Sequence, residues 1–218
     1  MKRTILILAA VIIGCVVVNA QQVSDKSLQS AVLKLDRADK AKDYEQLANE
    51  FLQIASSEKS NWLSWYYAAF CNAKVGWLKQ DDPDNIETFA DKAEEQIKKS
   101  RVLLDTASQK KELAEVYCVL SMLNRARVFM NPATYGREYG PKASQYVKMA
   151  ETADSSNPRA LYLEGWEKFA TPKAWGGDKV KAKEILLKSK QQLDANSSVG
   201  VYPHWGKKEV EELLNQLK

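Results

Sequence analysis

The fold is decided by stretches such as ASQYVKMA, residues 143–150, in which Ala143 is followed four residues later by Val147 and three later again by Ala150. Residues three and four apart share one face of a helix, so such a set marks a narrow contact face. Its recurrence on segments with helical periodicity predicts an α-solenoid of stacked helical hairpins. The other three sets are Ala48/Leu52/Ala55, Ala93/Ile97/Ser100 and Ala182/Leu186/Ser189.

Helical periodicity extends over the rest of the chain, and no stretch alternates apolar and polar residues long enough to indicate a strand. Pro83, Pro141 and Pro158 mark helix starts, because the first helical turn has no backbone hydrogen bond to lose there. Asp82 and Asp178 are candidate N-caps. The sequence therefore predicts an all-α protein. The expected helices span residues 25–37, 43–57, 61–78, 84–104, 108–130, 141–154, 158–170, 178–194 and 206–217.

Residues 1–20 have the features of a secretory signal peptide. Lys2 and Arg3 precede an apolar run at residues 5–18, which is shorter than the roughly 18 to 20 residues that span a bilayer. We expect cleavage after Ala20 and export to the periplasm.

An alternative for this segment is lipidation, because residues 12–15 fit a bacterial lipobox that ends at Cys15. The protein would then be an envelope lipoprotein anchored through Cys15. Against this alternative, three valines at residues 16–18 continue the apolar run beyond the cysteine.

The charge of the chain excludes nucleic acid as a partner. Once Lys2 and Arg3 are removed with the signal peptide, 30 basic residues face 28 acidic ones, and the basic residues are dispersed. This distribution lacks the basic patch that nucleic-acid binding requires. No later apolar run has the length of a membrane span.

Two cysteines remain after cleavage, Cys71 and Cys118, each inside an apolar helical stretch. They are buried free thiols, or they form a disulfide between adjacent hairpins in an oxidising compartment. Both alternatives stay open. Two cysteines and one histidine are too few to predict a zinc site.

The helix before each small-residue set carries bulky side chains, as in WLSWYYAAF at residues 62–70. Bulky residues on a first helix (A) and spaced small residues on a second (B) resemble the tetratricopeptide repeat family over most of residues 43–194. The resemblance implies a right-handed α-solenoid of about four hairpins, with the A helices lining a groove for a protein or peptide. The helix at 206–217 would cap the stack, which gives one domain at residues 21–218.

The chain departs from that family in the length of its repeats. The first alanines of the four sets are 45, 50 and 39 residues apart, against 34 in the family. We assign the extra residues mainly to turns between A and B helices at 79–85, 131–140 and 171–177. The motif NPRA at residues 157–160 adds a looser resemblance to secreted tetratricopeptide-like proteins of Gram-negative bacteria.

Aromatic residues on the A helices are candidate contacts for a partner. Trp62, Trp65 and Tyr66 belong to a cluster of five aromatic rings, and Tyr162 and Trp166 lie on the A helix at 158–170. Rigid aromatic side chains make good anchors in a groove. The alternative is that they pack the core.

Polar side chains near the same groove are further candidates. Arg127 and Arg159 would clamp a carboxylate of a ligand or an acidic partner through paired hydrogen bonds, with Asn124 beside them. The alternative is a solvated helix face.

The turn at residues 171–177 offers Trp175, because turns held on a rigid stack are common binding elements. The alternative is that Trp175 packs against Tyr202 and Trp205 and closes the end of the core.

The sequence gives no support for catalysis, a metal or a cofactor. His204 is the only histidine, and it lies in an expected loop. Three aspartates at residues 81–84 lack the twelve-residue calcium loop, and Gly176-Gly177 is too short to indicate a phosphate loop.

We therefore expect a non-enzymatic exported scaffold that binds a protein or peptide through its A-helix groove. The alternative is a small-molecule binder, similar to the tetratricopeptide-like partners of solute-transport systems. Its pocket would lie between the A helices and would be lined by Trp65, Tyr66, Arg127 and Trp166.

Overall fold

The computed structural model describes residues 26–195 and 200–218, and these ranges contain helices and turns but no strand. The predicted all-α fold is confirmed. The predicted signal peptide and Cys15 lie outside the described residues. The chain is helical over residues 26–35 and then in α2 (Ala41–Ser57), α3 (Trp62–Leu78), α4 (Pro83–Val102), α5 (Lys110–Met130), α6 (Pro132–Ala153), α7 (Pro158–Ala170), the 3₁₀ turn η1 (Lys173–Trp175), α8 (Lys179–Ala195) and α9 (Lys207–Gln216).

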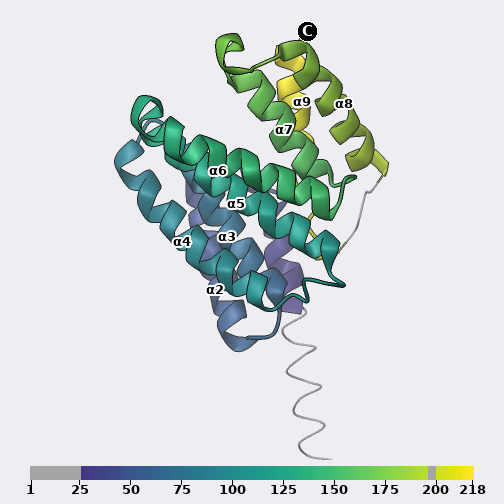
Figure 1. The fold of residues 1–218 in the computed structure, drawn as a ribbon. Helices are drawn as coiled ribbons and strands as arrows, with labels where there is room; N and C mark the ends of the chain where they lie inside the picture. Colours follow the sequence, from purple (N-terminus) through teal and green to yellow (C-terminus); the bar gives the residue numbers. More distant parts are fainter. Residues whose placement is uncertain (1–25, 196–199) are drawn as a thin grey trace, which may run out of the picture.

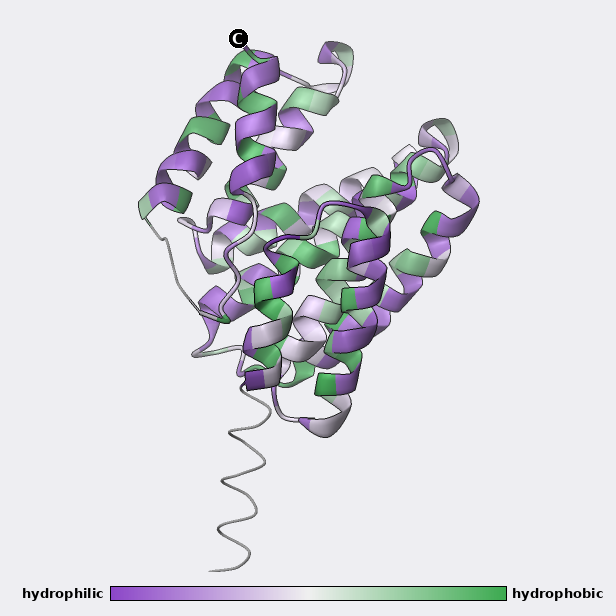
Figure 2. Cartoon of the chain, turned by 180° about the vertical axis from the view of Figure 1, so that it is seen from behind, coloured by the Kyte–Doolittle hydropathy of each residue, from purple (hydrophilic) through white to green (hydrophobic). Residues whose placement is uncertain are grey.

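Consecutive helices pack against each other, and α5 also packs on both α3 and α7. Figure 1 shows α2 to α6 as one block, with α7, α8 and α9 grouped at its upper end. Hydrophobic and hydrophilic residues alternate along the helices, as expected of helices that bury one face (Figure 2). Among the described helices, none is long and apolar enough to cross a membrane.

The four small-residue sets lie on α2, α4, α6 and α8, and every member except Leu52 is buried. In two of the sets the third residue also forms a hydrogen bond to the paired A helix. Ser100 Oγ donates a hydrogen bond to the carbonyl of Trp62 (3.0 Å), and Ser189 Oγ donates to that of Pro158 (2.7 Å). Each carbonyl belongs to the first residue of an A helix. The small residues therefore allow close packing and fix where the partner helix starts.

Helices α7 and α8 approach each other closely at Gly165. A Cβ atom there would lie 2.7 Å from Cγ of Leu186, the central residue of the fourth set. The A helices α3 and α5 approach in the same way, since a Cβ at Gly76 would lie 2.9 Å from Cβ of Ala126. Glycine is needed at both crossings because any side chain would push the helices apart.

We expect Gly165→Ala to lower the free energy of unfolding by about 1 to 3 kcal/mol through overpacking, as measured by urea denaturation. The matched control is Gly136→Ala on α6, where a new methyl group meets nothing within 4 Å. The control should be neutral or should raise stability by about 0.5 to 1 kcal/mol, the helix preference of alanine over glycine. Equal stability of the two variants would contradict the close approach.

Helix α6 begins at Pro132 and not at Pro141, so the predicted turn at 131–140 is wrong. The side chain of Asn131 accepts hydrogen bonds from the backbone N–H groups of residues 133 and 134, both at 3.1 Å, which caps the helix start. Pro141 lies inside the helix and cannot bond the carbonyl four residues earlier. Two proline start signals occur in this stretch, and the one that follows a capping asparagine sets the boundary.

The two predicted aspartate caps have different outcomes. Asp178 Oδ1 accepts from the backbone N–H groups of Val180 and Lys181, both at 2.9 Å, so its capping role is confirmed. Asp82 makes no such bond, and its carboxylate accepts instead from the side chain of Asn85 (2.8 and 2.9 Å). Asp82 occupies the N-cap position of α4, as predicted, but its carboxylate does not bond the backbone, because Asn85, three residues later, supplies a competing donor.

Cys71 and Cys118 are both buried and free. The interpretation as buried thiols is confirmed, and no bond joins them in this structure. Burial raises the pKa of both thiols, so they stay protonated and unreactive at neutral pH.

Candidate functional site

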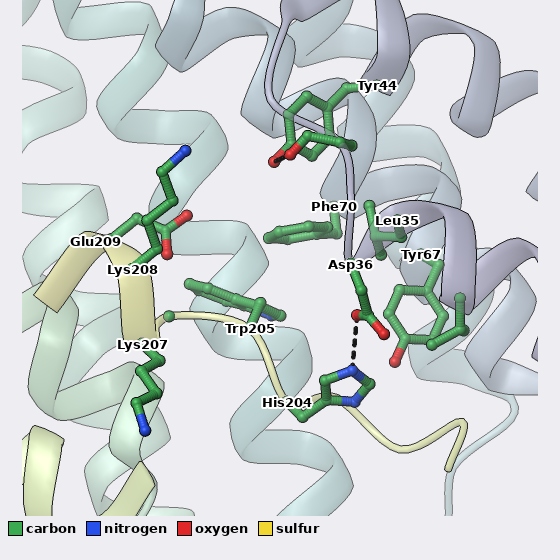
Figure 3. A pocket seen from close by; sticks show the side chains of 13 residues that line it. Leu35, Asp36, Tyr44, Tyr67, Phe70, His204, Trp205, Lys207, Lys208 and Glu209 are labelled. Carbon is green, nitrogen blue, oxygen red and sulfur yellow. Dashed lines mark hydrogen bonds and ion pairs between the residues drawn. The ribbon is translucent and has the colours of Figure 1, made fainter. Parts of the chain in front are cut away.

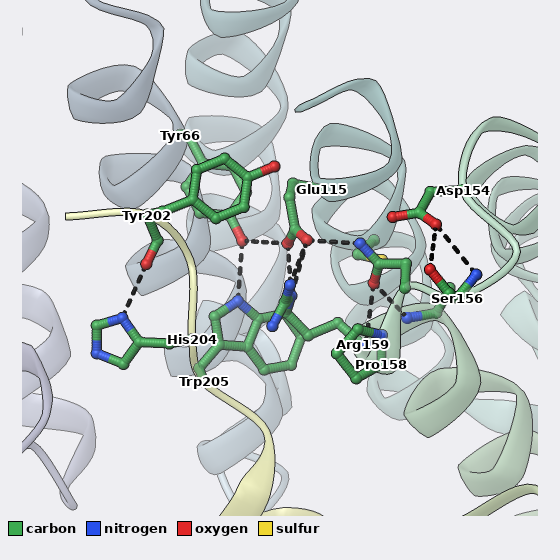
Figure 4. A network of polar contacts seen from close by, with 12 residues as sticks. Tyr66, Glu115, Asp154, Ser156, Pro158, Arg159, Tyr202, His204 and Trp205 are labelled. Atoms are coloured by element: carbon green, nitrogen blue, oxygen red, sulfur yellow. Dashed lines mark hydrogen bonds and ion pairs between the residues drawn. The ribbon is translucent and has the colours of Figure 1, made fainter. Parts of the chain in front are cut away.

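Residues 201–206, which we call the C-terminal strap, lie across α3. The hydroxyl of Tyr67 donates a hydrogen bond to the carbonyl of Val201 (2.8 Å). The indole N–H of Trp205 donates to the hydroxyl of Tyr66 (2.8 Å; Figure 4). The part of the A-helix face where we predicted a bound peptide is therefore covered by the chain itself.

Trp205 is the main apolar contact of the strap. Its ring stacks on Phe70 of α3, with centroids 4.8 Å apart, and meets Tyr162 of α7 edge-on at 6.2 Å. The next residue, Gly206, has φ of +112°, a conformation that favours glycine, and it turns the chain into α9. The strap thus joins α3 to α7, the last of the A helices.

A buried ion pair lies beneath the strap. Glu115 on α5 is fully buried, and its carboxylate accepts from Arg159 at 2.6 Å (Nη2) and 2.7 Å (Nε). The side chain of Asn157 and the hydroxyl of Tyr66 also donate to it, at 2.5 and 3.2 Å. Burial alone would lower the pKa of Arg159, but the charge and hydrogen bonds of Glu115 hold it above its ordinary value. One polar network therefore ties α3, α5, α7 and the strap together (Figure 4).

A cavity of about 300 Å³ lies beside the strap, between residues 32–44, α3 and the start of α9 (Figure 3). Aromatic and aliphatic side chains form its walls, and charged side chains stand around it. A concave apolar site with a few polar groups is the usual form of a ligand pocket. The lining residues are Val32, Leu35, Asp36, Ala38, Tyr44, Tyr67, Phe70, His204, Trp205, Gly206, Lys207, Lys208 and Glu209.

His204 joins the strap to the end of the first helix. Its Nε2 lies 2.7 Å from Oδ1 of Asp36, and its Nδ1 lies 2.8 Å from the carbonyl of Tyr202 (Figure 3 shows the contact with Asp36). Both ring nitrogens are therefore engaged in polar contacts. Sequence reasoning placed His204 in a loop without a site, whereas the structure places it on the cavity wall.

Two tyrosines on the cavity wall are held in the neutral form. The hydroxyl of Tyr44 donates to the carbonyl of Ala38 (3.2 Å), and that of Tyr67 is bonded to the strap. Burial is the main cause that raises the pKa of both phenols above the ordinary value. Neither group supplies a phenolate at neutral pH.

Two lysines at the start of α9, Lys207 and Lys208, line the cavity and carry positive charge to it. Lys207 pairs with Asp194 (2.7 Å) and Lys208 pairs with Asp39. Lys207 and Lys208 keep more than half of their side-chain surface exposed, so their ion pairs are weak and easily exchanged for a ligand's charge. Lys74 of α3 does not line the cavity and is largely buried against Glu209 at 2.5 Å.

Three of the predicted partner-binding residues, Tyr66, Arg159 and Tyr162, meet around the strap. All three are buried. Tyr66 bonds Trp205, Arg159 pairs with Glu115, and Tyr162 packs against Trp205. Arg159 does clamp a carboxylate, as its chemistry predicts, but the carboxylate is the chain's own.

Trp62 and Trp65 diverge on α3. The ring of Trp62 meets Tyr202 of the strap at 6.2 Å. The ring of Trp65 instead receives the ammonium group of Lys99 from α4, 4.7 Å from its centroid. The two tryptophans therefore contact different elements.

Asn124 and Arg127 are both buried near the end of α5. The side-chain amide of Asn124 donates to a carbonyl of its own helix. Arg127 pairs with three carboxylates of α4, those of Glu87 (3.2 Å), Asp91 (2.7 Å) and Glu94 (2.8 Å). Arg127 is thus held within the protein and does not extend from a solvated helix face.

Trp166 and Trp175 lie in contrasting surroundings. Trp166 packs with Trp77 (centroids 5.0 Å apart) and Phe129 (5.8 Å). Trp175 is 81% exposed, so the expected packing against Tyr202 and Trp205 is wrong. The left-handed Gly176 that follows turns the chain and leaves the ring in solvent.

None of the nine predicted residues lines the cavity. The sequence did carry a signal there, because YPHW at residues 202–205 is richer in rings than a connecting segment needs. Its partners, however, are far away in the chain. Tyr67 is 134 positions from Val201, and Asp36 is 168 positions from His204.

Comparison with known proteins gives one match of high overlap. The chain is similar to a solved structure described as the HusA haemophore from Porphyromonas gingivalis, with 30% sequence identity and a TM-score of 0.78. The match covers 88% of this chain and 92% of that chain. No protein-family model and no curated protein matches the sequence.

Proposed function

Because the chain belongs to the family of the HusA haemophore, we propose that it is an exported, non-enzymatic binding protein for haem. The observation that carries this proposal is the 30% identity over nearly the full length of both chains. The cavity beside the strap supports it independently, since its chemistry matches such a ligand. Cleavage after Ala20 and the lipid anchor at Cys15 remain alternative predictions for how the protein is exported.

The cavity walls suit a flat apolar ligand. Phe70 and Trp205 present stacked rings, and Val32 and Leu35 add aliphatic surface. Aromatic faces bind a planar ring system through offset stacking and burial of apolar area. The macrocycle of haem is the part of the ligand that these walls would hold.

The charged side of the cavity suits the two carboxylates of haem. Lys207 and Lys208 are largely exposed, and charge-assisted hydrogen bonds to carboxylates are among the stronger ones. The cavity of about 300 Å³ is at the small end of the range for ligand pockets, roughly 300 to 1,000 Å³. We therefore propose that the macrocycle enters edge first and leaves its carboxylates near the lysines.

The cavity offers no free ligand for the iron. Both nitrogens of His204 are engaged, one of them with Asp36, and the phenols of Tyr44 and Tyr67 are neutral. The other lining carboxylate, Glu209, is paired with Lys74. A metal ligand must be deprotonated and accessible. The proposal therefore assigns affinity to ring contacts and carboxylate contacts of the porphyrin.

This assignment predicts that haem and iron-free protoporphyrin bind with similar affinity, which titration followed by absorbance and tryptophan quenching would measure. Replacing both Lys207 and Lys208 with glutamate should lower the affinity for both ligands about tenfold, because two contacts to the carboxylates are lost. The matched control replaces Lys110 and Lys111, an adjacent exposed pair on α5, in the same way and should leave affinity unchanged.

Two results would count against the proposal in different ways. If neither porphyrin binds the wild type, haem binding itself is wrong. If both bind but the variant at Lys207 and Lys208 matches the control, the ligand lies elsewhere on the protein.

The predicted peptide scaffold is the weaker alternative. The strap covers α3 where a peptide would lie, through Tyr66, Tyr67 and Trp205. The small-molecule alternative is the one we keep, with a pocket beside the strap in place of one between Trp65 and Trp166.

A further inference from the structure

The turn between α7 and α8 carries exposed apolar side chains at the edge of the molecule. Trp175 is 81% exposed and Val180 is 73% exposed. Figure 1 shows this turn projecting at the upper end of the chain, beside the C-terminus and away from the block formed by α2 to α6. Large apolar side chains with this exposure and with charged neighbours often mark an interaction site.

The exposure of Trp175 is built into the turn. Gly176 has φ of +92°, and Gly177 is buried so tightly that a Cβ atom would lie 1.7 Å from the carbonyl oxygen of Thr171. The N–H of Asp178 donates to the carbonyl of Lys168 on α7 (2.9 Å). The turn is therefore held against α7, and the ring of Trp175 is presented by a fixed backbone.

The same segment concentrates positive charge. Residues 168–183 contain five lysines and one acid, Asp178. The carboxylate of Asp178 is engaged by the backbone at the start of α8. Lys173 has no carboxylate partner within the described residues, and Lys179 lies over the ring of Phe169 (5.4 Å) without an ion pair. Their charges are available to a partner, although the chain as a whole is nearly balanced.

We propose that the tip patch, formed by Lys173, Trp175, Lys179 and Val180, docks the protein on an anionic lipid surface. Tryptophan settles at the level of lipid headgroups, with its ring in the apolar boundary and its N–H toward water. Lysines beside it meet the negative headgroups, and their stems follow the apolar boundary.

The shape of the patch favours lipid over a protein partner. Tryptophan anchors in protein interfaces fill pockets and are ringed by contacts that exclude water. Here the ring is exposed on a projecting turn, beside lysines that have no carboxylate partner among the described residues, which suits a soft, uniformly charged surface. The patch is also separate from the cavity, because none of its four residues lines it.

The test uses the mature chain and two kinds of vesicle, phosphatidylcholine alone and phosphatidylcholine with phosphatidylglycerol. We expect co-sedimentation with the anionic vesicles only, and its loss at high salt because surface charges are screened. Replacing both Lys173 and Lys179 with glutamate should weaken binding to the anionic vesicles by at least about 25-fold, because each lysine near the surface contributes about fivefold. Trp175→Ser should also weaken it and should leave the melting temperature unchanged.

A matched control separates the patch from the general effect of removing an exposed apolar side chain. Val102→Ser removes an apolar side chain that is 80% exposed on α4, and it should bind the vesicles as the wild type does. The proposal is overturned if the wild type does not bind anionic vesicles, or if the tip variants bind them as well as Val102→Ser does. A third outcome would also overturn the proposal. If the tip variants no longer bind whole cell envelopes but still bind vesicles as the wild type does, the partner is a protein.

Discussion

Replacing Glu115 with glutamine is expected to lower the free energy of unfolding by about 3 to 5 kcal/mol, the usual cost of leaving one member of a buried ion pair alone. Glu115 is fully buried and Arg159 is 6% exposed, so water cannot solvate the arginine once its partner is neutral. Urea denaturation followed by circular dichroism would measure the loss.

Two further variants distinguish the buried charge from a general effect of the substitution. Glu95→Gln removes a carboxylate that pairs with Lys99 on the surface of α4, and it should change stability by less than about 1 kcal/mol. Replacing Glu115 with glutamine and Arg159 with methionine together should cost less than the sum of the two single changes. Additive losses would mean that the two side chains do not depend on each other.

Local signals predicted the helices and the faces that they bury. The small-residue sets on α2, α4, α6 and α8 depend on spacings of three and four residues, which any helix places on one side. Their burial follows because two helices approach closely only where side chains are small. The third residues of two sets, Ser100 and Ser189, add hydrogen bonds that such spacing does not predict.

The candidate site was missed because its contacts connect distant parts of the chain. Glu115 and Arg159 are 44 positions apart, and Trp205 and Tyr66 are 139 apart. A glutamate between Ala114 and Val116 was the available signal of a buried charge, since a polar residue in an apolar stretch needs a partner. Which arginine supplies that partner depends on how α5 and α7 pack, and the sequence pattern does not specify it.

We expect Trp205→Ala to lower stability by about 3 kcal/mol and to weaken porphyrin binding as well. The ring stacks on Phe70, meets Tyr162 and donates to Tyr66, so its removal leaves a void under the strap and deprives the Tyr66 hydroxyl of one of its two hydrogen bonds. The value is at the low end for tryptophan because the ring is partly exposed. Thermal unfolding with and without haem would measure both effects.

Trp205→Phe separates the two contributions of this side chain. Phenylalanine keeps an aromatic surface against Phe70 but loses the N–H that bonds Tyr66, so stability should fall by only about 1 kcal/mol and porphyrin should still bind. Trp175→Ala is the matched control, since that ring is 81% exposed and its loss should change stability by less than about 0.5 kcal/mol. If Trp205→Ala unfolds like this control, the ring does not hold the strap. If the variant is destabilised yet binds porphyrin at full affinity, the ligand does not use the wall that Trp205 forms.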